Sequence, residues 1–193
     1  MKKLSCAGIL GMLVTVAFFS FSCEKDDICV EGTIATPLLV IEFFDLDEFN
    51  ATGNDIVKNT TDLWVEAVNP NTEVVNGVTV IVDAIQATPQ NVSTISIPLR
   101  TVENSTEYRF ISEYALDDDG NQLGNEDILT FNYETQEIFL SRACGYITNY
   151  TLNETDGAVV TDDGNNWINV TSGVVISENI VQNETVTHVK IYH

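Results

Sequence analysis

Basic side chains are scarce in this sequence. Eight Lys and Arg residues stand against 29 Asp and Glu residues, and the formal net charge of the 193-residue chain is −21. A surface this acidic repels phosphate backbones, which excludes nucleic acid as a partner. High negative charge also keeps a protein soluble and provides carboxylates that can bind calcium. Solubility alone is sufficient to explain the charge.

Catalytic motifs are missing as well. The sequence has no Gly-x-Ser-x-Gly elbow, no His-Glu-x-x-His pair and no phosphate-cradling glycine loop. Of the two histidines, only His188 lies within the body of the domain, and the alternation of the last strand predicts a solvent-side or rim position for it. Carboxylates are so abundant that their number does not indicate a glycosidase pair. We therefore expect no enzymatic activity, no catalytic residue and no cofactor.

No stretch has the apolar spacing of a confident helix, and short alternating or β-branched runs follow one another instead. About nine such strands at spacings of roughly ten residues predict an all-β fold, a single antiparallel β-sandwich domain over 37–193. Residues 45–61 are expected to form a loop, and residues 128–133 and 136–142 a hairpin that turns near Glu134. The clearest strands are Pro37–Phe44, Leu63–Val68, Val78–Ile85, Val92–Leu99 and Glu107–Leu116.

An apolar leader precedes this domain. Lys2 and Lys3 supply a positive start and Leu4–Phe21 an uncharged apolar run, as in a secretory signal peptide. Small residues, Ser20 and Ser22, stand before Cys23, as a signal peptidase requires. We predict that residues 1–22 are removed and that Cys23 is acylated. A permanent membrane span is the alternative, since the run just reaches the roughly 20 residues that a spanning helix needs.

The four cysteines divide between these roles. Cys6 leaves with the leader and Cys23 takes the lipid, which leaves Cys29 and Cys144 as an even pair in an oxidising compartment. We predict that these two form a disulfide, since two lone thiols lack the Cys-x-x-Cys spacing of a metal site. In the chain-entropy model a bridge over so long a loop stabilises the domain by about 4–5 kcal/mol. Residues 23–36 then form the lipidated cysteine and an acidic tether.

The residues after Cys23 indicate where the mature protein is located. Glu24–Asp27 resembles the acidic tract that follows the lipidated cysteine in surface-exposed lipoproteins of Bacteroidota, although a solvated spacer would look the same. Several further blocks stand out, namely Cys23–Cys29, Thr36–Pro37, Pro98–Phe110, Leu129–Tyr133, Phe139–Tyr146, Asn166–Ile168 and Asn183–His193. Together they are similar to an uncharacterised, domain-of-unknown-function lipoprotein family of Bacteroidota. The resemblance implies envelope location and a single domain, and no activity.

One acidic loop, residues 117–127, is the candidate metal site. Alternating oxygen ligands there resemble the start of an EF-hand loop, but Gln122 and Ile128 stand where that loop needs Gly and Glu. The loop could still supply oxygens to an irregular calcium site, and the simpler interpretation is a solvated turn. The candidate ligands are Asp117, Asp119, Asn121, Glu126 and Asp127.

Aromatic residues offer a second kind of binding site. Trp64, Trp167 and several tyrosines could stack on sugar rings, although most aromatics of a sandwich are core residues. We therefore expect a non-enzymatic envelope module, anchored through lipid in the outer membrane, surface-exposed or otherwise facing the periplasm. Its partner would be an envelope protein or a glycan. The alternative is a calcium- or glycan-binding surface adhesion module that uses residues 117–127.

Overall fold

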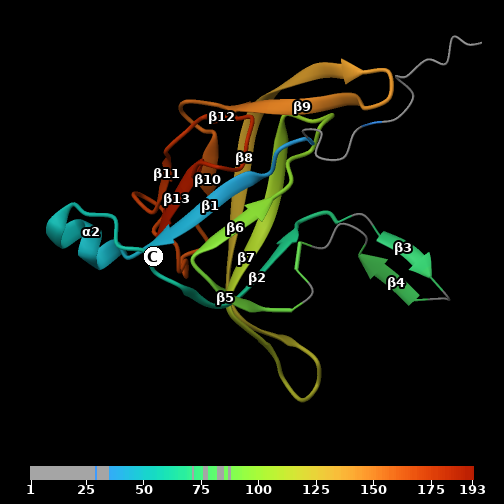
Figure 1. Ribbon diagram of the computed structural model, residues 1–193. Helices are drawn as coiled ribbons and strands as arrows, with labels where there is room; N and C mark the ends of the chain where they lie inside the picture. The colour runs from blue at the N-terminus through green and yellow to red at the C-terminus, as the bar shows by residue number, and fades with distance from the viewer. Residues whose placement is uncertain (1–28, 30–34, 71, 76–77, 82–84, 87) are drawn as a thin grey trace, which may run out of the picture. The chain divides into compact units, whose positions relative to one another are not determined.

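The computed structural model describes Cys29 and residues 35–70, 72–75, 78–81, 85–86 and 88–193 (Figure 1). The predicted signal peptide, Cys23 and most of the tether lie outside these residues. The chain divides into two compact units. The smaller unit includes Cys29 and Phe139–Tyr146, and the larger one includes residues 35–138 and Ile147–His193.

A four-stranded sheet forms one layer of the larger unit. Its order is β11 (Val174–Ile176), β13 (Val189–Tyr192), β1 (Leu39–Phe44) and β6 (Thr94–Ile97). β1 is an apolar run, LVIEFF, and five of its six residues are buried because it lies inside the sheet with both faces covered. This bears out the strand that the sequence predicts over Pro37–Phe44.

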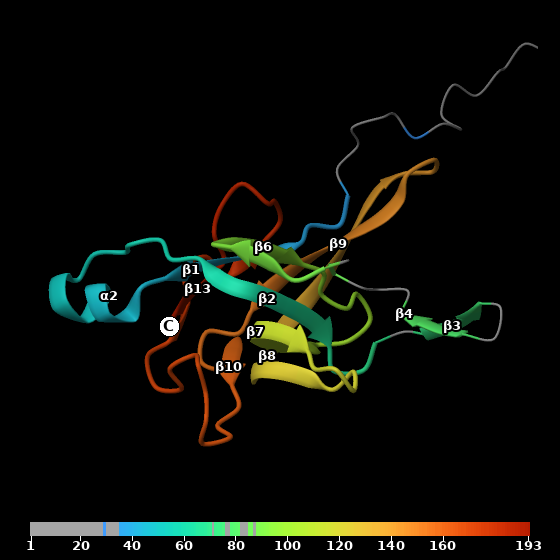
Figure 2. The same ribbon diagram turned by 90° about the horizontal axis from the view of Figure 1, so that it is seen from below.

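The second layer is a seven-stranded sheet in the larger unit, with β8 and β9 continuing into the smaller one. Figure 2 shows the layer of β1, β6 and β13 lying over that of β2, β7 and β8. A separate hairpin pairs β3 (Thr72–Val75) with β4 (Val78–Ile81). The seven strands are β2 (Thr60–Ala67), β5 (Gln90–Val92), β7 (Ser105–Leu116), β8 (Gln122–Ser141), β9 (Gly145–Leu152), β10 (Ala158–Val160) and β12 (Ile180–Val181).

The core lies between the two sheets and follows strand alternation. Ile41 and Phe43 of β1 face Phe110 of β7 and Phe131 of β8 in one cluster, and all four side chains are fully buried. Each such side chain contributes roughly 1.5–3 kcal/mol of burial free energy. The prediction of an all-β, sandwich-like fold is confirmed.

Several finer predictions were wrong. Thirteen strands lie in the described part of the chain where the sequence predicts about nine. The sandwich is not wholly antiparallel, because β1 and β13 pair in parallel, Ile41 opposite Val189.

A short helix replaces part of the predicted 45–61 loop. α2 (Leu46–Thr52) begins where Asp45 accepts a hydrogen bond from the Glu48 amide, and it ends at Gly53, whose φ of 73° suits a left-handed residue. Both caps were visible in the sequence. A helix of seven residues is nevertheless too short to show a helical apolar period, so the pattern missed it.

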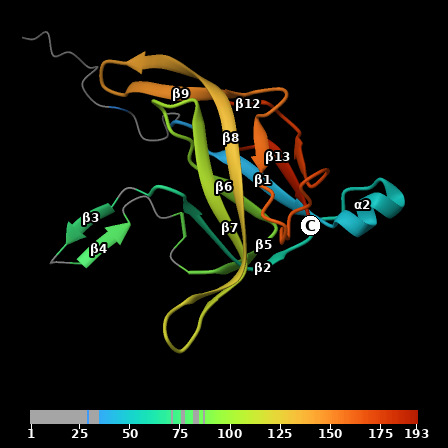
Figure 3. The same ribbon diagram turned by 180° about the vertical axis from the view of Figure 1, so that it is seen from behind.

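β8 also differs from the sequence-based prediction of a hairpin. It runs for 20 residues, straight through the turn predicted near Glu134 (Figure 3). Glu134 and Thr135 include no Gly, Pro, Asn or Asp, so nothing in the sequence demands a turn there. The actual reversal comes at the β8–β9 connection, between Ser141 and Gly145, where Gly145 has a φ of 70°.

Candidate functional site

A disulfide joins Cys29 to Cys144 in the smaller unit. The Sγ atoms are 2.09 Å apart and the Cα atoms 4.9 Å apart, so the pairing predicted from the cysteine count is confirmed. Cys144 lies in the turn between β8 and β9, where its amide donates to Ser141 Oγ at 3.0 Å. The bridge therefore fastens the beginning of the described chain to that turn.

Two aromatic rings flank this turn. Phe139 is 54% exposed and Tyr146 is 65% exposed, and their ring centroids lie 5.1 Å apart at an interplanar angle of 57°. Such tilted aromatic pairs attract each other by about 0.5–1.5 kcal/mol. The two side chains thus form a joint apolar surface beside the disulfide.

Three tyrosine hydroxyls hold one short segment of the larger unit in place. Tyr108 donates to the carbonyl of Pro98, Tyr150 to that of Leu99 at 2.9 Å, and Tyr133 to that of Arg100 at 3.0 Å. Burial raises the pKa of Tyr150 to about 12, so its hydroxyl stays a donor. No pattern in the sequence predicts these three contacts, although Pro98 and Tyr108 both lie in the block Pro98–Phe110.

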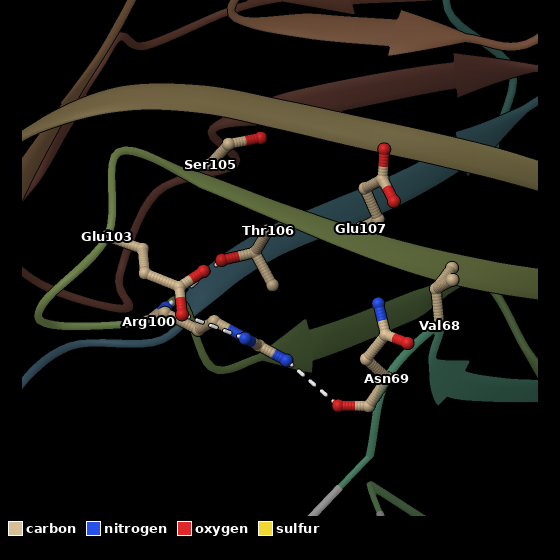
Figure 4. A pocket seen from close by; sticks show the side chains of 7 residues that line it. All are labelled: Val68, Asn69, Arg100, Glu103, Ser105, Thr106 and Glu107. Atoms are coloured by element: carbon tan, nitrogen blue, oxygen red, sulfur yellow. Dashed lines mark hydrogen bonds and ion pairs between the residues drawn. The ribbon is translucent and has the colours of Figure 1, made fainter.

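Arg100, the last residue of this clamped segment, lines a pocket (Figure 4). Its guanidinium donates to Glu103 Oε1 and to the carbonyl of Asn69, both at 2.9 Å. The Glu103 hydrogen bond raises the pKa of Arg100. The pocket measures about 170 Å³, below the roughly 300–1,000 Å³ of small-molecule sites. The guanidinium of Arg100 is already paired with Glu103 and Asn69, so its role in this pocket is better explained as bracing the loop than as binding a ligand.

A second pocket, of about 400 Å³, is lined only by polar and acidic residues apart from Leu152. Glu134 and Glu154 bring two carboxylates, and Asn153 and Asn179 bring amides. Ligand sites are usually lined by apolar and aromatic side chains with a few polar groups among them. Neither pocket includes His188 or His193.

The five candidate calcium ligands have different partners in the structure. Asp117 forms a turn, accepting from the amides of Asp119 and Asn121 and from the Asn121 side chain. These hydrogen bonds, Asn121's first, lower the pKa of Asp117. The turn is short, because β7 ends at Leu116 and β8 begins at Gln122.

The remaining acidic ligands have other partners. Glu126 Oε2 lies 3.5 Å from Arg109 Nη1. Asp127 is buried, with 1% exposure, and accepts from the Ile168 amide at 2.7 Å and from Asn166 Nδ2 at 2.8 Å. Among the residues that the structure describes, no group of three or more His, Cys, Asp or Glu side chains could hold a metal ion. A calcium site at this loop stays a prediction.

His188 is not at the rim, and that prediction was wrong. It is completely buried, and its Nδ1 accepts a hydrogen bond from the Val40 amide at 3.0 Å. Burial lowers its pKa, which favours the neutral ring that this contact needs. The error arose because alternation along β13 does not show that β1 pairs alongside and covers that end of the strand. His188 is a structural residue.

The two tryptophans proposed as sugar-stacking residues make contacts within the fold. Trp64 stacks on Tyr114 with centroids 5.2 Å apart, and its Nε1 donates to Glu66 Oε2. Trp167 Nε1 donates to the carbonyl of Phe110 at 3.1 Å, and its ring meets the His193 ring edge-on. Trp64, Tyr114 and Trp167 are all half-buried, and Trp167 packs against the core.

No helix within the described ranges is long and apolar enough to cross a membrane. In comparisons with known proteins, a family of unknown function, DUF6452, matches residues 63–193. No curated protein matches the chain, and no solved structure does.

Proposed function

This chain belongs to DUF6452, a family of unknown function, and on that premise we propose that it is a non-enzymatic binding or assembly module of the bacterial envelope, anchored through an acylated Cys23. The proposal extends to a Bacteroidota outer-membrane lipoprotein that faces the medium. Its partner is an envelope protein or a glycan.

The Cys29–Cys144 disulfide is the observation that carries this proposal. Protein disulfides persist in oxidising compartments and are rare in the cytosol, so the bridge favours an exported protein. It also accounts for two of the four cysteines, which leaves Cys23 as the thiol that follows the apolar leader. Cys23 follows the small residues Ser20 and Ser22 at the end of the leader, which is where an exported lipoprotein is acylated.

The non-enzymatic part of the proposal is supported by the roles of the titratable groups. The His188 ring accepts a backbone hydrogen bond inside the core, Asp127 binds the Ile168 amide, and the Arg100 side chain braces a loop. Each of these groups is hydrogen-bonded to main-chain or side-chain atoms of the fold. The high acidity supports a domain whose surface is mostly solvated.

Metabolic labelling with a fatty acid tests the anchor. We expect label on the wild-type chain, loss of label in Cys23→Ala, and retained label in the matched control Cys6→Ala, because Cys6 lies inside the leader. Protease treatment of intact cells then tests the orientation, and a surface-exposed domain is degraded without lysis. An unlabelled wild-type chain, or a Cys23→Ala variant that keeps its label, contradicts the proposal.

A further inference from the structure

The disulfide places the proposed lipid anchor close to one particular turn. Cys29 is bonded to Cys144, which lies between β8 and β9. Cys23 precedes Cys29 by only six residues, and six residues span at most about 20 Å when fully extended. If Cys23 is acylated, as proposed above, Cys144 lies at most about 25 Å from it, because the Cα atoms of the bridged cysteines add 4.9 Å to that reach.

The turn also presents the surface that such a location requires. Phe139 and Tyr146 are both more than half exposed and contact each other beside the bridge. Tyrosine is enriched at membrane–water interfaces, because its ring is apolar and its hydroxyl is polar. Phenylalanine is typical of the apolar side of interfacial segments. Two such rings on one turn suit the boundary between headgroups and acyl chains.

The charge of the turn also favours contact with lipid headgroups. Phe139–Tyr146 contains no Asp or Glu and one Arg, Arg142, within a chain whose net charge is −21. Most of the acidic surface would be repelled by anionic lipids, but this segment would not be.

We propose that the β8–β9 turn inserts Phe139 and Tyr146 into the headgroup region of the bilayer that holds the Cys23 acyl chains. The turn then acts as a second, shallow contact with the membrane. This proposal rests on the proposed acylation of Cys23. Rings that stay in the aqueous phase, where a protein partner could cover them, are the competing outcome of the test.

The experiment uses the full-length, acylated protein in vesicles of phosphatidylethanolamine and phosphatidylglycerol. Tyr146→Trp introduces an indole at the turn, and Leu116→Trp is the matched control, since Leu116 is 57% exposed and lies at the β7 end in the larger unit. The emission of Trp64 and Trp167 is subtracted with the wild-type protein. Lipids brominated near the headgroup serve as quenchers.

We expect the Tyr146→Trp emission to shift to shorter wavelength and to lose intensity with the brominated lipids, and the Leu116→Trp emission to change in neither respect. Phe139→Trp, a second position on the same surface, should behave like Tyr146→Trp. Unquenched indoles at both turn positions in a vesicle-bound, acylated protein overturn the insertion and leave the anchor standing. Equal quenching at position 116 also overturns it. A chain that mass spectrometry shows to lack acyl groups overturns the anchor and the insertion together.

Discussion

The hydroxyl of Tyr150 donates a buried hydrogen bond to the main-chain carbonyl of Leu99 at 2.9 Å, between residues 51 positions apart in the sequence. Tyr108 and Tyr133 make the same contact with the two neighbouring carbonyls, of Pro98 and Arg100. Three consecutive carbonyls between β6 and β7 are thereby satisfied by side chains of three different strands. Because this segment has no strand partner of its own there, the tyrosines replace the missing ladder.

Tyr150→Phe should lower the free energy of unfolding by about 1–3 kcal/mol, because it leaves the Leu99 carbonyl buried without its donor. Urea unfolding followed by circular dichroism measures the change. Tyr146→Phe is the control, since that hydroxyl belongs to a side chain that is 65% exposed and its loss should cost under about 0.5 kcal/mol. Equal stability of Tyr150→Phe and wild type would show that the carbonyl finds another donor.

Reduction of the Cys29–Cys144 bridge should destabilise the domain. The two cysteines are 115 residues apart, and removal of a native bridge of that kind typically costs about 2–5 kcal/mol. Denaturant midpoints with and without dithiothreitol measure the loss. The double variant Cys29→Ser/Cys144→Ser should show the reduced midpoint in both conditions, and a reductant effect that persists in it would point to another thiol.

Asp127→Ala should cost about 1–3 kcal/mol, because the Ile168 amide and the Asn166 side chain both lose a buried acceptor. If this carboxylate is structural, the loss is equal in calcium and in EDTA, and wild type melts at the same temperature in both. Asp119→Asn, in the exposed turn, is the control and should change stability by less than about 0.5 kcal/mol. A wild-type melting temperature that rises at millimolar calcium would instead favour the calcium site.

Stability should fall as the pH drops from about 6.5 towards 4. Burial lowers the pKa of His188, and burial together with the Lys58 charge lowers that of His193 to about 4. In this pH window the two histidines bind more protons in the unfolded chain than in the folded chain, so acidification favours unfolding. The loss from His193 amounts to at most about 3 kcal/mol.

Urea unfolding at pH 7, 5.5 and 4 measures this slope. His193→Gln should flatten it, whereas the carboxyls of Asp45 and Asp55, whose pKa values are lowered by hydrogen bonds, matter only below about 3.8. Asp127 acts in the opposite sense, because burial raises its pKa. An unchanged slope in His193→Gln would assign the pH dependence to other groups.

Much of the fold could be predicted because strand patterns are local. The β-branched alternation marked β2, β6 and β7, and the apolar run marked β1. The disulfide could be predicted because cysteine counting needs no structure. In contrast, the continuity of β8 and the short helix α2 were missed, since the first lacks a turn signal and the second is too short for its own period.

The site was harder to predict than the fold. The acidic loop looked like one group of ligands because its residues are close in sequence, yet Asp127 points to Ile168 and Glu126 to Arg109. His188 looked like a rim residue because alternation along one strand says nothing of the strand beside it. The Phe139–Tyr146 pair had no signal at all, since which aromatics remain uncovered is decided by packing.

The sequence by itself determined the all-β class, the Cys29–Cys144 pair and the acidic character, because each follows from local patterns or from residue counts. Only the tertiary structure decided that β1 and β13 lie in parallel, that three tyrosines clamp Pro98–Arg100, and that two aromatic rings stay exposed beside the disulfide. These features depend on contacts between residues far apart in the chain, and such contacts are set by which apolar faces bury one another.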